Sequence, residues 1–108
     1  MTTAIAYFEL AGPNAEALAR FYESVLGWSS QPGPFPNYLS LPAANTGIAG
    51  GLRQESTPEC LLYFRVPDLR ATLDLVTQAG GKVLIPPTDV PGVASFEDIA
   101  GNRVGLIR

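Results

Sequence analysis

Two stretches that lie 54 residues apart decide the fold: NAEALARFYESVLG at residues 14–27 and DLRATLDLVTQAGG at residues 68–81. Each begins with a good helix-capping residue, continues with apolar residues at helical spacing, and ends in a glycine, which predicts two equivalent helices. The same offset brings Gly51 onto Gly105 without a gap. A repeat of this length indicates one supersecondary unit used twice.

Strand patterns flank both predicted helices in the same order. In the first unit, residues 4–54, strands are expected at 4–10, 28–30, 37–41 and 48–54. In the second unit, residues 60–108, they are expected at 60–66, 82–85, 93–98 and 102–107, with Pro86 and Pro87 in a loop. The sequence therefore predicts an α+β fold, in which a single domain of residues 1–108 contains two strand–helix–strand–strand–strand units.

Alternation along the first strand of each unit predicts which way the side chains point, because successive residues of a strand face opposite sides of the sheet. The side chains expected to face the helices are Phe8, Leu10, Leu62, Phe64 and Val66. The side chains expected on the opposite, open face are Tyr7, Glu9, Leu61, Tyr63 and Arg65. Function is therefore expected on the face that carries the carboxylate, the tyrosines and the arginine.

Composition excludes several classes of function. The chain has 108 residues, 46% of them apolar and 16% charged, which is typical of one globular domain. The net charge of −3 comes without any basic stripe, so a nucleic-acid partner is not expected. With no signal pattern and no apolar stretch near 18 residues, we expect no membrane association and a cytoplasmic location. The lone cysteine, Cys60, opens an apolar strand and is expected to be a buried thiol.

Three segments resemble signatures of one family: YFEL at residues 7–10, FYESVLGW at residues 21–28, and DIAGNRVGL at residues 98–106. They are similar to the vicinal oxygen chelate superfamily, which includes glyoxalase I, extradiol dioxygenases and the fosfomycin- and bleomycin-resistance proteins. The resemblance covers nearly the whole chain. It implies paired βαβββ units that form a curved mixed sheet, a cup with the helices outside, and a homodimer with two equivalent clefts.

The resemblance also locates the metal-ligand positions of the family, where His, Glu or Gln side chains hold a divalent ion. The residues at those positions are Tyr7, Gly51, Leu61 and Gly105. Leucine and glycine side chains cannot coordinate a metal, and a neutral tyrosine is a poor ligand. The chain also has no histidine. We therefore expect no metal, no other cofactor and no glyoxalase I activity.

Several side chains are candidates for binding a ligand in the cup, each with a structural alternative. Glu9 is favoured to form a salt bridge with Arg53 or Arg65, with ligand binding and proton transfer as alternatives. A glycine pair ending in Gly51 indicates room for a ligand, a bulge, or the close approach of another strand. The candidate ligand-binding residues are Tyr7, Glu9, Tyr38, Gly51, Arg53, Leu61, Tyr63 and Gly105, and none is assigned a catalytic role.

Together these patterns favour a metal-free protein that binds a small molecule as a homodimer. The alternative is a lyase, isomerase or dioxygenase-like enzyme that uses non-standard residues such as Glu9. A third hypothesis is an accessory protein whose role is the dimer itself. Resemblance of fold alone does not decide among these functions.

Overall fold

The computed structural model describes residues 3–108. The chain divides into two compact units, and each is described by itself. The N-terminal unit comprises Tyr7–Cys60, and the C-terminal unit comprises Leu61–Arg108 together with the residues before Tyr7. No helix in the described part of the chain is long and apolar enough to cross a membrane.

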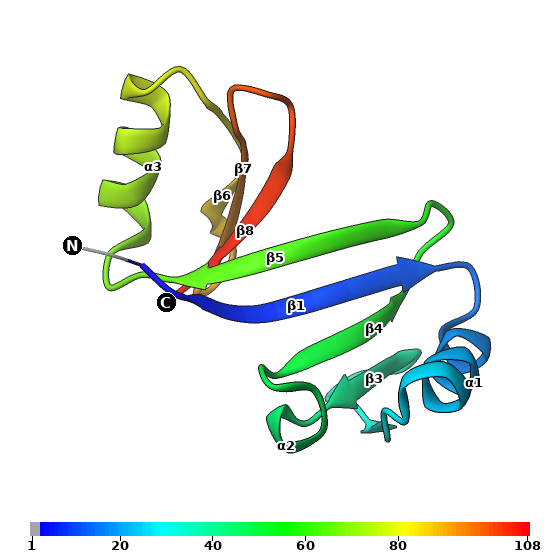
Figure 1. Cartoon of the computed structure of the whole chain (residues 1–108). Helices are drawn as coiled ribbons and strands as arrows, with labels where there is room; N and C mark the ends of the chain where they lie inside the picture. Colours follow the sequence, from blue (N-terminus) through cyan, green and yellow to red (C-terminus); the bar gives the residue numbers. More distant parts are fainter. Residues whose placement is uncertain (1–2) are drawn as a thin grey trace. The chain divides into compact units, whose positions relative to one another are not determined.

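The N-terminal unit contains four strands and two helices (Figure 1). Its elements are β1 (Ile5–Gly12), α1 (Ala15–Leu26), β2 (Gln31–Pro32), β3 (Tyr38–Leu41), α2 (Ala43–Thr46) and β4 (Gly50–Gln54). The strand order is β2-β3-β4-β1, in which β1 and β4 run parallel and the other pairs antiparallel. α1 packs against β3 and β4.

The C-terminal unit repeats this plan without a second helix (Figure 1). Its elements are β5 (Glu59–Arg65), α3 (Leu69–Gln78), β6 (Lys82–Val90), β7 (Val93–Glu97) and β8 (Arg103–Ile107). The strand order is β5-β8-β7-β6, and β5 and β8 are the parallel pair. The α+β class and the two βαβββ units predicted from the sequence are confirmed.

The 54-residue repeat is present in the hydrogen bonds as well as in the order of elements. Asn14 accepts a hydrogen bond from the amide of Ala17, and Asp68 accepts the equivalent bond from Ala71, both at 3.0 Å. The strand registers match too: Glu9 is opposite Gly51, and Tyr63, 54 residues on, is opposite Gly105.

The offset is not constant, however, so the expectation of a repeat without a gap is wrong in one strand. Tyr38 is opposite Arg53, whereas the residue opposite Ile107 is Val93, which gives an offset of 55 between β3 and β7. The reason lies in the connections that follow these strands. The N-terminal unit inserts the short helix α2 between β3 and β4, and the C-terminal unit uses the turn that begins at Asp98.

Each helix covers an apolar face of its own sheet. In the C-terminal unit, the buried core is formed by Val66, Leu69, Leu73, Ala94 and Leu106, with Phe64, Val83 and Phe96 packed against it. In the N-terminal unit, Leu41 and Leu52 are almost completely buried. Trp28 stacks on Tyr22 at the end of α1 and contacts Phe8, with ring centroids 5.2 and 5.7 Å apart. Phe8, Phe64 and Val66 thus lie on the helix side, as the alternation predicts.

Three local expectations are wrong. Pro86 and Pro87 lie inside β6 and not in a loop, which is possible because β6 is an edge strand with a shifted register there. Cys60 is exposed, as is Leu62 on the same face of β5, because the core under α3 takes in only Phe64 and Val66 further along that face. The strand expected at residues 28–30 begins only at Gln31.

Candidate functional site

The face of the N-terminal sheet opposite α1 carries a cluster of polar side chains, which we call the Glu9 cluster: Tyr7, Glu9, Tyr38, Arg53 and Glu59. Strand pairing builds it. Glu9 on β1 is opposite Gly51 on β4, and Arg53, two residues further along β4, is opposite Tyr38 on β3. Because residues two apart share a face, three neighbouring strands direct these side chains to the same place.

Glu9 is the centre of this cluster and is only 8% exposed. The Tyr38 hydroxyl donates to its Oε2 at 2.7 Å, and Nη1 of Arg53 donates to its Oε1 at 3.0 Å. The hydroxyls of Tyr7 and Tyr38 are 2.5 Å apart. Since the single hydroxyl proton of Tyr38 is directed at Glu9, Tyr7 must be the donor to Tyr38. The hydrogen bonds therefore run from Tyr7 through Tyr38 to the carboxylate.

Arg53 also contacts two further carboxylates. Its Nη2 is 2.5 Å from Oε1 of Glu59, and its Nε is 3.5 Å from Oε1 of Glu55. One guanidinium is thus surrounded by three carboxylates, counting Glu9, which leaves a formal surplus of two negative charges. The Glu9–Arg53 salt bridge, which the sequence favoured for Glu9, is present. Arg65, the other predicted partner, lies in the C-terminal unit and donates to the backbone oxygen of Arg108.

Both tyrosines of the cluster hold their protons tightly. Burial raises the pKa of Tyr38 far above its usual value, and its hydrogen bonds to Tyr7 and Glu9 raise it further. The pKa of Tyr7 is raised by burial and by the negative charge of Glu9, although its hydrogen bond to Tyr38 acts in the opposite direction. Both phenols are therefore neutral at physiological pH and act as hydrogen-bonding groups, not as bases.

The predicted glycines face tyrosine side chains of the protein itself. A Cβ atom on Gly51 would lie within 2.6 Å of three atoms of Tyr38, including its hydroxyl oxygen. A Cβ atom on Gly105 would lie within 3.0 Å of the Tyr63 ring. The absence of a side chain at each position therefore makes room for a tyrosine, an explanation that the sequence analysis did not include.

These positions do not fit the metal that the fold family uses. Gly51 and Gly105 supply no donor atom, Leu61 is a buried hydrocarbon side chain, and the hydroxyl of Tyr7 is committed to Tyr38. Among residues 3–108, no group of three or more His, Cys, Asp or Glu side chains is placed to hold a metal ion. No chemical step through a metal is therefore derived for this chain.

The structure brings Tyr7, Glu9, Tyr38, Gly51 and Arg53 together within the N-terminal unit. The other predicted site residues lie in the C-terminal unit, where Tyr63 and Gly105 are neighbours and Leu61 is 1% exposed. Glu59 was missed by the sequence analysis. Glu59 is the first residue of β5 and immediately precedes the strand expected at residues 60–66. No sequence pattern predicts its contact with Arg53, which lies six residues earlier across a turn.

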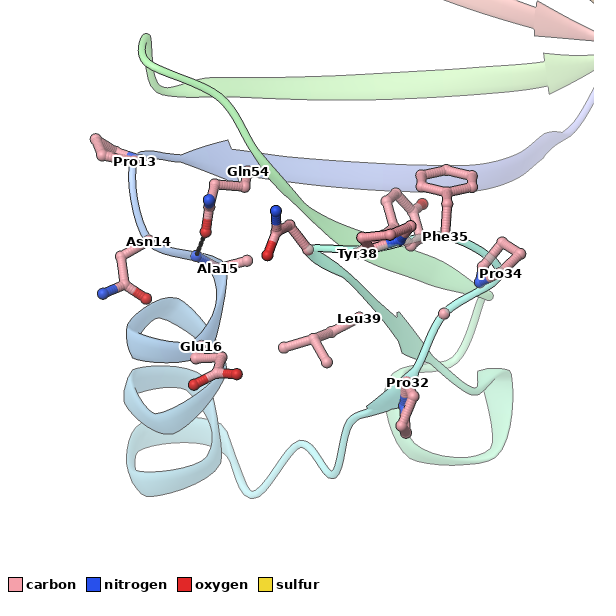
Figure 2. A pocket seen from close by; sticks show the side chains of 13 residues that line it. Pro13, Asn14, Ala15, Glu16, Pro32, Pro34, Phe35, Tyr38, Leu39 and Gln54 are labelled. Atoms are coloured by element: carbon pink, nitrogen blue, oxygen red, sulfur yellow. Dashed lines mark hydrogen bonds between the residues drawn. The ribbon is translucent and has the colours of Figure 1, made fainter.

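The N-terminal unit also has a groove next to Tyr38 (Figure 2). It lies between the start of α1 and the loop that joins β2 to β3, with a volume of about 790 Å³. Pro32, Pro34, Phe35 and Leu39 line one side, and Asn14 and Glu16 the other. The sequence analysis expected strands at 28–30 and 37–41 on either side of this proline-rich segment and assigned the segment no site.

Known proteins resemble this chain in sequence and in fold. A glyoxylase-like domain-containing protein of Didymella fabae is 27% identical over 91% of this chain and 88% of its own length. The anthracycline biosynthesis protein DnrV of Streptomyces peucetius is 31% identical over 95% of this chain and 46% of its own length. A glyoxalase/bleomycin resistance protein/dioxygenase superfamily member from Vibrio splendidus has the same fold, with a TM-score of 0.68 at 13% identity over 97% of both chains. These likenesses support the vicinal oxygen chelate superfamily as the family of this chain.

No family model matches the chain. The chain spans less than half the length of DnrV. The likeness to the vicinal oxygen chelate superfamily agrees with the resemblance seen in the three sequence segments. It also makes the donor set unusual, because the superfamily metal positions in this chain are a tyrosine, a leucine and two glycines.

Proposed function

We propose that this chain is a metal-independent small-molecule-binding protein that uses the Glu9 cluster to hold its ligand. The observation that carries the proposal is Glu9 itself, a carboxylate that is 8% exposed and bonded to both a phenol and a guanidinium. Burying a charge costs free energy, so a buried carboxylate held by specific charged and polar partners is a candidate for a binding group. The alternative, an enzyme that uses Glu9 in proton transfer, is less well supported because Arg53 already neutralises that carboxylate.

The charges of the cluster favour a ligand of a particular kind. With three carboxylates around one guanidinium, the surplus charge is negative, so the cluster attracts positive charge and hydrogen-bond donors. Tyr7 and Tyr38 add aromatic surface to this polar centre. We therefore propose a ligand that combines a flat ring with a cationic or donor group. Because one relative is named as an anthracycline biosynthesis protein, an anthracycline belongs in the ligand screen.

The test is a thermal-shift and calorimetric screen of flat aromatic and cationic compounds, carried out with and without EDTA. A ligand that binds only the native state raises the melting temperature, and the rise should be the same in chelator. Glu9→Gln should lower the affinity for the ligand about tenfold or more. Glu23→Gln, an exposed carboxylate on α1, is the matched control and should leave binding unchanged. Metal at near-unit stoichiometry, or binding abolished by EDTA, would overturn the proposal.

We further propose that the protein is a homodimer. In support, large apolar side chains remain exposed on α1, where Phe21 is 57%, Val25 59% and Leu26 54% exposed. Multi-angle light scattering at micromolar concentration should give twice the chain mass of 11.5 kDa. A mass of one chain across that range contradicts the dimer without affecting the ligand proposal.

A further inference from the structure

The groove beside α1 shares Tyr38 with the Glu9 cluster but otherwise has a lining of its own. We call it the proline groove and define it by Glu16 on α1, by Pro32, Pro34 and Phe35 on the β2–β3 loop, and by Leu39 on β3. We propose that the proline groove is a second ligand site, which takes a planar aromatic group bearing a positive charge, such as an aryl amidinium. The proposal does not depend on the function of the Glu9 cluster.

Size is the first argument. The groove encloses about 790 Å³, which is within the range of sites that hold small organic molecules. Figure 2 shows Phe35 beside Tyr38 at one end, and Leu39 directed toward the space between the strands and α1. Phe35 is 56% exposed, and its ring lies 4.7 Å from that of Tyr38. An exposed aromatic ring that is already oriented by a second ring offers a surface on which a flat ligand can stack.

The loop that forms one wall has its shape set before any ligand arrives. Prolines at 32, 34 and 36 fix three backbone angles, and Asn37 takes a left-handed conformation with φ of 62°. The amide of Gly33 donates to the carbonyl oxygen of Tyr38 at 2.8 Å, which closes the loop. At Gly33 a Cβ atom would clash with Tyr38, so the backbone approach itself requires glycine. Binding to a wall of this kind loses little conformational entropy.

The opposite wall is fixed by a bond between elements. Oε1 of Gln54, at the end of β4, accepts from the amide of Ala15 at 3.3 Å and so ties the start of α1 to the sheet. Because Asn14 caps the helix and Glu16 lies in its first turn, the positive end of the helix dipole is already compensated. This end of α1 is therefore not arranged to attract an anion.

Charge decides the class of ligand. Glu16 is the only charged side chain among the residues that line the groove, so the wall facing Phe35 carries a net charge of −1. The equivalent groove of the C-terminal unit gives the contrast. It has a volume of about 490 Å³, and each of its nine lining residues lies 54 positions after a residue that lines the first groove, although nothing in it corresponds to Pro32, Phe35 or Leu39. Arg70 and Arg108 stand where Glu16 and Gln54 would be. The repeat thus contains one groove suited to cations and one that is not.

Three probes of nearly equal shape test the charge preference: benzamidine, benzamide and benzoate. In a ¹⁵N nuclear magnetic resonance titration of the whole chain, benzamidine should shift the amide of Ala15 and the side-chain amide of Gln54. Benzamide should bind about threefold to fivefold more weakly, as expected for the loss of one exposed ion pair, and benzoate more weakly still. Equal affinity for the three probes, or no binding of benzamidine at all, overturns the proposal.

Two variants test the location. Glu16→Gln should lower benzamidine affinity about threefold to fivefold and leave benzamide unchanged, and Phe35→Ala should weaken both about threefold to tenfold. Both residues are exposed, so these variants keep the fold. Arg70→Gln, at the position equivalent to Glu16, is the control and should change neither affinity.

The outcomes separate this site from the Glu9 cluster. If Glu9→Gln abolishes benzamidine binding while Glu16→Gln and Phe35→Ala do not, the probe occupies the Glu9 cluster; the second site is then refuted and the proposed function stands. If only Glu16→Gln and Phe35→Ala weaken the probe, the second site is supported, whatever the Glu9 cluster binds.

Discussion

The N-terminal and C-terminal units solve one packing problem in two ways. Both place a glycine on the strand parallel to the first strand of the unit, opposite Glu9 in one case and Tyr63 in the other. In the C-terminal unit, Tyr63 itself covers Gly105. In the N-terminal unit, the residue opposite the glycine is a carboxylate, and the ring that covers Gly51 comes from Tyr38 on the next strand.

The difference shows what a buried charge requires. In the C-terminal unit, one side chain, that of Tyr63, is enough to cover Gly105. Glu9, in contrast, requires Tyr38 and Arg53 as partners, and Arg53 in turn contacts Glu55 and Glu59. Each side chain of this network provides a hydrogen bond or an ion pair to another. Removing one of them therefore leaves a buried polar or charged partner without that interaction, which destabilises the fold. The N-terminal unit should therefore be much more sensitive to substitution on this face.

The largest effect is expected at Arg53. Arg53→Met removes the guanidinium that donates to the buried Glu9 carboxylate and should lower the free energy of unfolding by about 3 kcal/mol. Arg65→Met, on the exposed end of β5, should cost less than about 0.5 kcal/mol. Urea denaturation followed by circular dichroism measures both. Equal losses at the two arginines would show that the network does not stabilise the N-terminal unit.

The next largest effect is expected for Gly51→Ala, which tests how tightly Tyr38 covers this glycine. The added methyl group displaces Tyr38 from its bonds to Glu9 and Tyr7, and we expect a loss of about 2 kcal/mol. In the Tyr38→Phe background the ring is no longer held by these bonds, so the same substitution should cost less. A double-mutant cycle in urea that gives strictly additive losses would rule out this account.

The sequence was sufficient to predict the repeated unit, because the patterns that mark its helices and strands are local. The caps at Asn14 and Asp68, the glycines, and the alternation along β1 and β5 depend on neighbours within a few residues. The helix side of Phe8 and Phe64 follows from alternation alone. The Glu9–Arg53 bridge was favoured for the same reason, since both residues were expected on one face.

What the sequence did not reveal depends on contacts between distant segments. Tyr38 covers Gly51 only because β3 pairs with β4 in a register that no local pattern specifies. The edge position of β6 decides that Pro86 can remain in a strand, and Cys60 is exposed because the core under α3 takes in only the later residues of that face of β5. The proline groove likewise requires α1 to pack on β3 and β4, where the bond between Ala15 and Gln54 ties the start of α1 to the end of β4.

Alkaline pH provides a smaller test of the Glu9 cluster within the N-terminal unit. The pKa of Tyr38 is raised in the folded protein, so at pH above about 10 the unfolded chain loses this proton while the folded chain keeps it. Its contribution to stability is therefore complete below pH 10 and is lost as the pH rises further, by about 1.4 kcal/mol per pH unit. Tyr38→Phe should show a correspondingly shallower decline between pH 10 and 11 in urea denaturation. Tyr22→Phe, on α1, is the control, and a shallower decline in that variant as well would contradict the assignment.

The smallest effect is expected where the units are most alike, at the helix caps. Asn14 and Asp68 make the same bond at the same distance and differ in charge alone. Because a negative charge is favourable at the start of a helix, Asn14→Asp should stabilise the protein by about 0.3–0.5 kcal/mol and Asp68→Asn should destabilise it by a similar amount. Both changes should fade at 1 M salt, where the Debye length falls to about 3 Å. The two thermal shifts must have opposite signs and similar sizes if the repeat is equivalent at this position. If Asn14→Asp instead lowers the melting temperature, repulsion from the nearby carboxylate of Glu16 outweighs the attraction to the helix dipole. The two helix starts would then be equivalent in geometry but not in electrostatics.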